Sequence, residues 1–226
     1  MSSPRVTEQG LQRRLVGWWV LVGLLALVNF SSNFASDEDP PDDFLYRYET
    51  AIVGAFFYLL ILAIVLVIAS GLNPRDAFGL RRPTSWATAI GLAFGLLIVM
   101  LIVAGLLEPV FGAGEEQGLD PPGWIPERAP ALVLNALVAA VIAPVVEELL
   151  FRGIGFYLLA QFGQLAAILV TGVAFALVHG ILEGLPIFFI IGVGLAFIRS
   201  RTASIYPALI MHGGFNGTGL IVGLFT

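Results

Sequence analysis

Seven long, mostly apolar stretches constrain the fold of this chain more than any other feature. They lie at about residues 15–35, 51–72, 85–107, 131–159, 165–182, 186–198 and 203–224. A helix needs roughly 20 mostly apolar residues to cross the hydrocarbon core of a bilayer. Backbone groups in lipid must pair with one another, so stretches of this length form helices rather than strands. The sequence therefore predicts an all-α, polytopic transmembrane bundle of about seven helices.

Composition excludes several classes of protein. Charged residues make up 12% of the 226 residues, whereas soluble domains contain roughly 25%, and too few charges remain to cover a globular surface. The chain has neither cysteine nor lysine, which excludes a disulfide framework, a thiolate nucleophile, a Schiff base and a Ser–Lys dyad. Its formal net charge of −5 argues against nucleic acid as a partner.

The arginines predict the orientation in the membrane, because cytoplasmic loops are enriched in basic residues. One set of connecting segments contains Arg5, Arg13, Arg14, Arg75, Arg81, Arg82, Arg199 and Arg201. The alternate set contains Arg47 and Arg128, together with Asp37, Glu38, Asp39, Asp42, Asp43, Glu49, Glu108, Glu115, Glu116, Asp120 and Glu127. We therefore expect an integral protein of the plasma membrane, with its N-terminus in the cytoplasm and its C-terminus outside.

Features near the ends of the predicted spans add detail. The first stretch follows arginines, as a secretory signal peptide would, but its length and the lack of a good cleavage site favour a retained anchor. Trp18, Trp19 and Trp86 fall near the predicted cytoplasmic ends, as in an interfacial aromatic belt. Two G-x-x-x-G spacings, Gly91/Gly95 and Gly213/Gly217, are typical of closely packed helices.

Ionisable residues inside membrane segments are energetically costly and indicate function. Here they gather in the second half of the chain. They are Glu147, Glu148 and Arg152 in the fourth stretch, His179 in the fifth and His212 in the seventh, where Asn216 follows. We accordingly divide the chain into residues 1–128, with about three spans and their loops, and residues 129–226, a helical core that carries the candidate site.

The spacings within this set suggest hydrolytic chemistry. Glu148 precedes Arg152 by four residues, the favourable order for an ion pair on a helix. Glu147 points about 100° away around the helix, so it is left free to act as a general base. Pro144 lies about one turn earlier and is expected to kink the helix, which opens room for water.

Two further helices bring imidazoles and an amide. His212 and Asn216 share one helix face, as do Phe175 and His179. Asn216 could orient His212 or donate to a developing oxyanion. Convergence of these helices would place one carboxylate and both histidines of the chain around a water, a plausible arrangement for hydrolysis.

These motifs resemble those of a known family. The patterns Glu147-Glu148-x-x-x-Arg152, Phe175-x-x-x-His179 and His212-x-x-x-Asn216 are similar to those of the CAAX protease and bacteriocin-processing (CPBP, or Abi) intramembrane proteases, over residues 130–220. The resemblance implies that Glu147 activates water, that His179 and His212 complete the site and that Asn216 stabilises the tetrahedral intermediate. Glu148 and Arg152 would support the first carboxylate. The implied substrate is a peptide or the lipidated C-terminal tail of a protein.

The resemblance leaves the metal and the exact role open. Two histidines and a carboxylate could bind zinc, since catalytic zinc sites use three protein ligands and a water, or they could act without metal, which we favour. No cofactor is assigned. A non-catalytic membrane scaffold or immunity protein of the same fold is the main alternative, and a proton-coupled transporter is a third, although repeated halves of the kind many transporters show are absent from the sequence.

Overall fold

The computed structural model describes residues 7–35, 41, 43–111 and 123–225, and every regular element among them is helical. The first half contains α1 (Glu8–Ala35), η1 (Phe44–Tyr46), α2 (Tyr48–Ile68), α3 (Pro74–Ala77) and α4 (Trp86–Phe111). The second half contains η2 (Pro126–Arg128), α6 (Ala129–Leu137), η3 (Val138–Ile142), α7 (Ala143–Glu148), η4 (Leu149–Gly155), α8 (Phe156–Leu159), η5 (Ala160–Phe162), α9 (Gln164–Val178), α10 (Leu185–Thr202) and α11 (Tyr206–Gly223).

The predicted all-α bundle is confirmed, and each of the seven apolar stretches forms a helix. Five helical segments of the described residues are long and apolar enough to cross a membrane: Glu8–Ser32, Tyr48–Ile68, Trp86–Leu107, Pro126–Phe162 and Leu185–Thr202. The helix α9 is apolar but shorter, with 15 residues. The sequence predicted a short sixth segment at 186–198, whereas α10 extends to Thr202.

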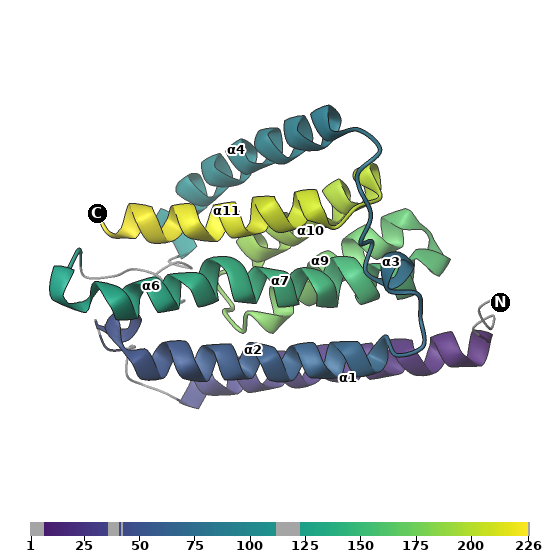
Figure 1. The fold of residues 1–226 in the computed structure, drawn as a ribbon, viewed down its shortest axis with the longest axis horizontal. Helices are drawn as coiled ribbons and strands as arrows, with labels where there is room; N and C mark the ends of the chain where they lie inside the picture. The colour runs from purple at the N-terminus through teal and green to yellow at the C-terminus, as the bar shows by residue number, and fades with distance from the viewer. Residues whose placement is uncertain (1–6, 36–40, 42, 112–122, 226) are drawn as a thin grey trace.

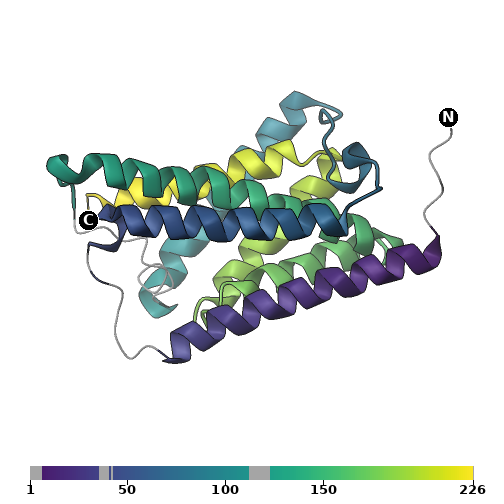
Figure 2. The ribbon, with the colours of Figure 1, turned by 60° about the horizontal axis from the view of Figure 1, so that its bottom comes forward.

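The helices form a bundle in which sequence-distant segments lie side by side. In Figure 1, α1 and α2 run in opposite directions along one side, and α4 lies on the other side beyond α11. The helix α7 lies between α2 and α11, and it contacts both. Figure 2 shows α9 beside α1, and the two helices contact each other. The described chain therefore begins and ends at opposite ends of the bundle (Figure 1).

The fourth apolar stretch is an interrupted helix. Two π-helical turns, η3 and η4, flank the short α-helix α7, and the backbone angles at Gly153 are not helical (φ −81°, ψ −105°). Such π turns release backbone carbonyls from the regular ladder and are frequent at functional sites. The kink predicted at Pro144 is therefore observed as two irregularities. The π turn η3 precedes α7, and the helical backbone is broken at Gly153 within η4.

Two neighbours stabilise this break. Gly153 packs so closely on Phe78 that a Cβ atom there would lie 2.7 Å from the ring. The carbonyl of Arg152 accepts a hydrogen bond of 3.1 Å from Nε of Arg199 on α10, whose guanidinium also lies over the ring of Phe156. Arg199 therefore donates a hydrogen bond to a carbonyl at the position where the helix is interrupted.

Two of the sequence expectations about the helix surfaces were wrong. Trp18 is fully buried and donates a hydrogen bond of 2.9 Å to the carbonyl of Leu150, so it is a core residue and not part of an aromatic belt. Trp19 and Trp86 are exposed, as a belt requires. A Cβ atom at Gly91 or Gly95 would meet nothing within 4 Å among the described residues, so that pair does not mediate close packing here.

The second glycine pair behaves as predicted. A Cβ atom on Gly213 would lie 2.6 Å from the carbonyl oxygen of Ala140. The missing side chain therefore lets α11 approach the π turn η3 directly. This contact brings the helix that carries His212 against the helix that carries Glu147.

Candidate active site

The ion pair predicted between Glu148 and Arg152 is present at the centre of the bundle. Arg152 Nη1 donates to Glu148 Oε1 at 3.0 Å, and both side chains are completely buried. Arg152 also donates from Nη2 to the carbonyl of Gly192 on α10 at 2.7 Å, and its guanidinium lies 4.5 Å from the ring centre of Phe175 on α9. The pair therefore ties α7 and η4 to both α9 and α10.

His212 lies between the two glutamates. Its Nδ1 is 3.0 Å from Glu148 Oε1, and its Nε2 is 3.7 Å from Glu147 Oε2. Because Glu148 is held as a carboxylate by Arg152, Nδ1 carries the hydrogen and donates it. In the neutral imidazole, Nε2 is then the unprotonated nitrogen, and it faces Glu147 across a distance too long for a direct hydrogen bond.

Glu147 is held by a residue that sequence reasoning missed. Tyr58 on α2 donates its hydroxyl proton to Glu147 Oε1 at 2.9 Å. The only signal in the sequence was a phenol within an otherwise apolar span, which is also compatible with ordinary packing. Glu147 retains 14% exposure of its side chain, in contrast to the fully buried Glu148.

His179 follows the last residue of α9 and lies on the aromatic side of the site. Its Nδ1 is 2.7 Å from the carbonyl of Phe175, which can only accept, so Nδ1 donates and Nε2 is unprotonated in the neutral ring. The imidazole stacks on Phe188, with ring centres 4.1 Å apart.

The turn after His179 depends on a close approach to α1. Gly180 has a φ of +72°, and a Cβ atom there would lie 2.6 Å from the backbone of Asn29. Only glycine satisfies both requirements without strain. Asn29 in turn donates from its amide to the carbonyl of Val178. The N-terminal helix therefore holds the segment that orients His179.

Asn216 lies on the same helix as His212 but contacts a different element. Its Nδ2 donates to the carbonyl of Ala139, in the π turn η3, at 2.9 Å. Asn216 therefore satisfies a carbonyl of the π turn. It makes no direct hydrogen bond to His212 in this structure, so the expected orienting contact is not observed. An amide nitrogen carries a second N–H, which remains for another acceptor.

The candidate donor side chains were compared with the requirements of a zinc site. A catalytic zinc site needs three protein ligands that converge to roughly 2.0–2.3 Å from one ion. In the part of the chain that the structure describes, no three His, Cys, Asp or Glu side chains are grouped closely enough to hold one ion. One oxygen of Glu147 and one nitrogen of each histidine already have hydrogen-bonding partners.

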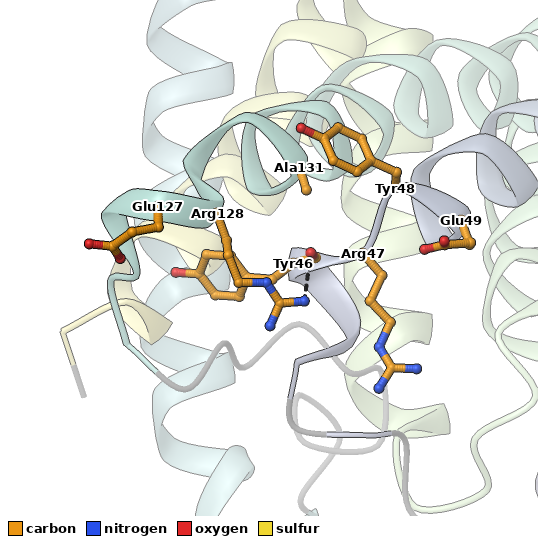
Figure 3. Close-up of a pocket in the computed structure, with 7 residues that line it drawn as sticks. All are labelled: Tyr46, Arg47, Tyr48, Glu49, Glu127, Arg128 and Ala131. Carbon is orange, nitrogen blue, oxygen red and sulfur yellow. Dashed lines mark hydrogen bonds between the residues drawn. The ribbon is translucent and has the colours of Figure 1, made fainter.

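A separate pocket, which the candidate catalytic residues do not line, is formed where η1 meets η2 and α6. Figure 3 shows its lining, in which Arg128 donates to the backbone carbonyl of Tyr46. Asp43 accepts hydrogen bonds from Arg47 and Arg128, and these bonds, that from Arg47 first, lower the pKa of the Asp43 carboxyl. The arginines are thus already paired, and the candidate catalytic residues take no part in this pocket.

Two comparisons with known proteins found matches. A helical membrane bundle with a buried Glu, His and Arg network is compatible with a membrane peptidase of the CAAX-protease-like class. Residues 129–218 match the family described as type II CAAX prenyl endopeptidase Rce1-like. The chain is also 24% identical over 212 residues to the Bacillus subtilis (strain 168) protein named "Putative membrane peptidase YdiL", with 86% of this chain and 84% of that protein covered. No solved structure matches. Both matches are to membrane or prenyl-protein peptidases, and the family match spans the segment that carries Glu147, His179, His212 and Asn216.

Proposed function

We propose that this protein hydrolyses a peptide bond within the membrane with a water molecule that Glu147 activates. The observation that carries the proposal is the distance of 3.7 Å between Glu147 Oε2 and His212 Nε2. One water can contact both atoms, since its hydrogen bonds are each about 2.8 Å long. The other polar atom of each side chain is held by a hydrogen bond. Tyr58 donates to Oε1 of Glu147, and Nδ1 of His212 donates to Glu148.

The proton balance follows from this arrangement. The water oxygen bonds to the carbonyl carbon of the substrate while its proton passes to Oε2 of Glu147. The tetrahedral intermediate then collapses, the C–N bond breaks, and Glu147 returns the proton to the departing amine. Arg152 already balances the charge of Glu148, so Glu147 is the carboxylate that changes its protonation state.

The other residues have assigned roles in this proposal. Asn216 offers its second N–H to the oxyanion of the intermediate. His179, with its Nδ1 engaged by Phe175, presents Nε2 toward water or substrate. Glu148 and Arg152 hold the imidazole of His212 in one tautomer. Residues 129–226 thus form the catalytic core, and the reaction needs no metal.

The substrate class comes from the family. The family that matches residues 129–218 is described as a CAAX prenyl endopeptidase, so we propose that the substrate is a prenylated C-terminal peptide or protein tail. The arginines Arg13, Arg14, Arg75, Arg81 and Arg82 fall in segments at one side of the alternating spans, which supports a cytoplasmic N-terminus. Arg5, Asp37, Glu38, Asp39, Asp42, Glu115, Glu116 and Asp120 lie outside the described residues.

The direct test is cleavage of a farnesylated C-terminal peptide by the purified protein in detergent. The wild type is expected to cleave the amide bond of the tail. His212→Ala is expected to lower kcat by about 10²-fold, because the water loses one of the two groups that position it. A folded wild-type protein that cleaves neither this peptide nor a panel of unprenylated membrane peptides would argue for the non-catalytic scaffold.

Removal of metal distinguishes a zinc-dependent reaction from metal-free hydrolysis. Incubation of the purified protein with a strong zinc chelator, followed by its removal, is expected to leave kcat/KM unchanged, because in the proposed reaction Glu147 alone takes the proton from water and no metal ion activates it. The control is a zinc peptidase treated in parallel. Loss of activity that returns on addition of zinc would contradict the metal-free mechanism and leave the peptidase assignment intact.

A further inference from the structure

A tyrosine from outside the family-matched segment contacts the proposed catalytic glutamate. Tyr58 lies on α2, whereas the family match covers residues 129–218. Its hydroxyl donates to Oε1 of Glu147 at 2.9 Å. A carboxylate only accepts hydrogen bonds, so the direction of this bond is fixed.

The bond makes the two oxygens of Glu147 inequivalent. Oε1 is occupied by the phenol, and Oε2 faces Nε2 of His212 at 3.7 Å. Without the phenol, the carboxylate is free to rotate about its last torsion, which is broad for glutamate. Catalytic geometry tolerates little such freedom, because small misplacements cost large factors in rate.

The position of α2 does not depend on this hydroxyl. The helix packs through buried Ala51, Ile61 and Val65. It contacts α6, α7 and η4, and Gly54 lies close to Val138. Removal of one oxygen atom from Tyr58 therefore leaves the packing of α2 in place and changes only the restraint on Glu147.

We propose that Tyr58 is a positioning residue of the active site, whose hydroxyl fixes Oε1 of Glu147 so that Oε2 is the oxygen that takes the proton from water. The inference rests on the proposed role of Glu147. It assigns a part of the reaction to the N-terminal helices, so that residues 129–226 alone do not make the complete site.

The test is a Tyr58→Phe variant assayed on the same farnesylated peptide. We expect kcat to fall by about 10- to 100-fold, as for the loss of a hydrogen bond to a charged group, while KM stays unchanged. The matched control is Tyr48→Phe, which removes a hydroxyl from an exposed position of the same helix and is expected to leave both constants unchanged. Thermal unfolding in detergent checks that each variant is folded.

The possible outcomes are distinct. A wild-type kcat in Tyr58→Phe, while Glu147→Gln is inactive, would overturn this inference and leave the proposed function standing. Full activity in Glu147→Gln would instead remove the proposed function itself. A rise in KM with kcat unchanged would assign Tyr58 to substrate binding and contradict positioning. If Tyr58→Phe does not fold, Tyr58→Gln, whose amide keeps a donor, is compared with Tyr58→Leu, and equal kcat values would count against the hydrogen bond.

Discussion

Replacement of Glu147 by glutamine is expected to lower kcat by about 10²- to 10⁴-fold, the range that general-base catalysis contributes. The amide has almost the same shape as the carboxylate, and its oxygen can still accept the hydrogen bond from Tyr58. It cannot, however, take a proton from water. Because the side chain is only partly buried and its packing is preserved, we expect the midpoint of thermal unfolding to stay unchanged. The measurement is kcat/KM on the farnesylated peptide.

The matched control for this variant is Glu183→Gln. Glu183 is exposed in the segment between α9 and α10, and the same chemical change there is expected to leave cleavage at the wild-type rate. An active Glu147→Gln enzyme would exclude Glu147 as the base. His212, with its unprotonated Nε2, would then be the group to examine.

Replacement of Arg152 by methionine is expected to destabilise the protein by about 3–5 kcal/mol, the usual cost of removing one partner from a buried ion pair. Glu148 would remain completely buried without its cation, and the carbonyl of Gly192 would lose its donor. The hydrogen bond from His212 to Glu148 cannot replace a full charge. The free energy of unfolding, measured by denaturant titration in mixed detergent micelles, gives the size of the effect.

Two comparisons sharpen this prediction. Arg81→Met removes one partner of an exposed ion pair with Asp76, and such pairs contribute about 0–1 kcal/mol. The double variant Glu148→Gln/Arg152→Met removes both charges and is expected to recover most of the lost stability. If Arg152→Met were no less stable than Arg81→Met, the pair would not be buried as the structure describes it, and the support for His212 would need another explanation.

The sequence by itself determined the features that depend on local spacing. Apolar stretches of about 20 residues determined the helices, because unpaired backbone groups are not tolerated in lipid. The pairing of Glu148 with Arg152 and the contact of Phe175 with His179 followed from the four-residue repeat of a helix, and both are present. The close approach at Gly213 likewise follows from the absence of a side chain.

Tertiary structure decided which helix faces meet, because helical periodicity fixes relative directions within one helix but not its rotation against its neighbours. This is why Trp18 is buried against Leu150 rather than exposed at an interface. It is also why Asn216 contacts the π turn and not His212. The contact between Tyr58 and Glu147 joins residues 89 positions apart. No local pattern predicts such a contact, since only the packing of α2 against α7 brings the two side chains together.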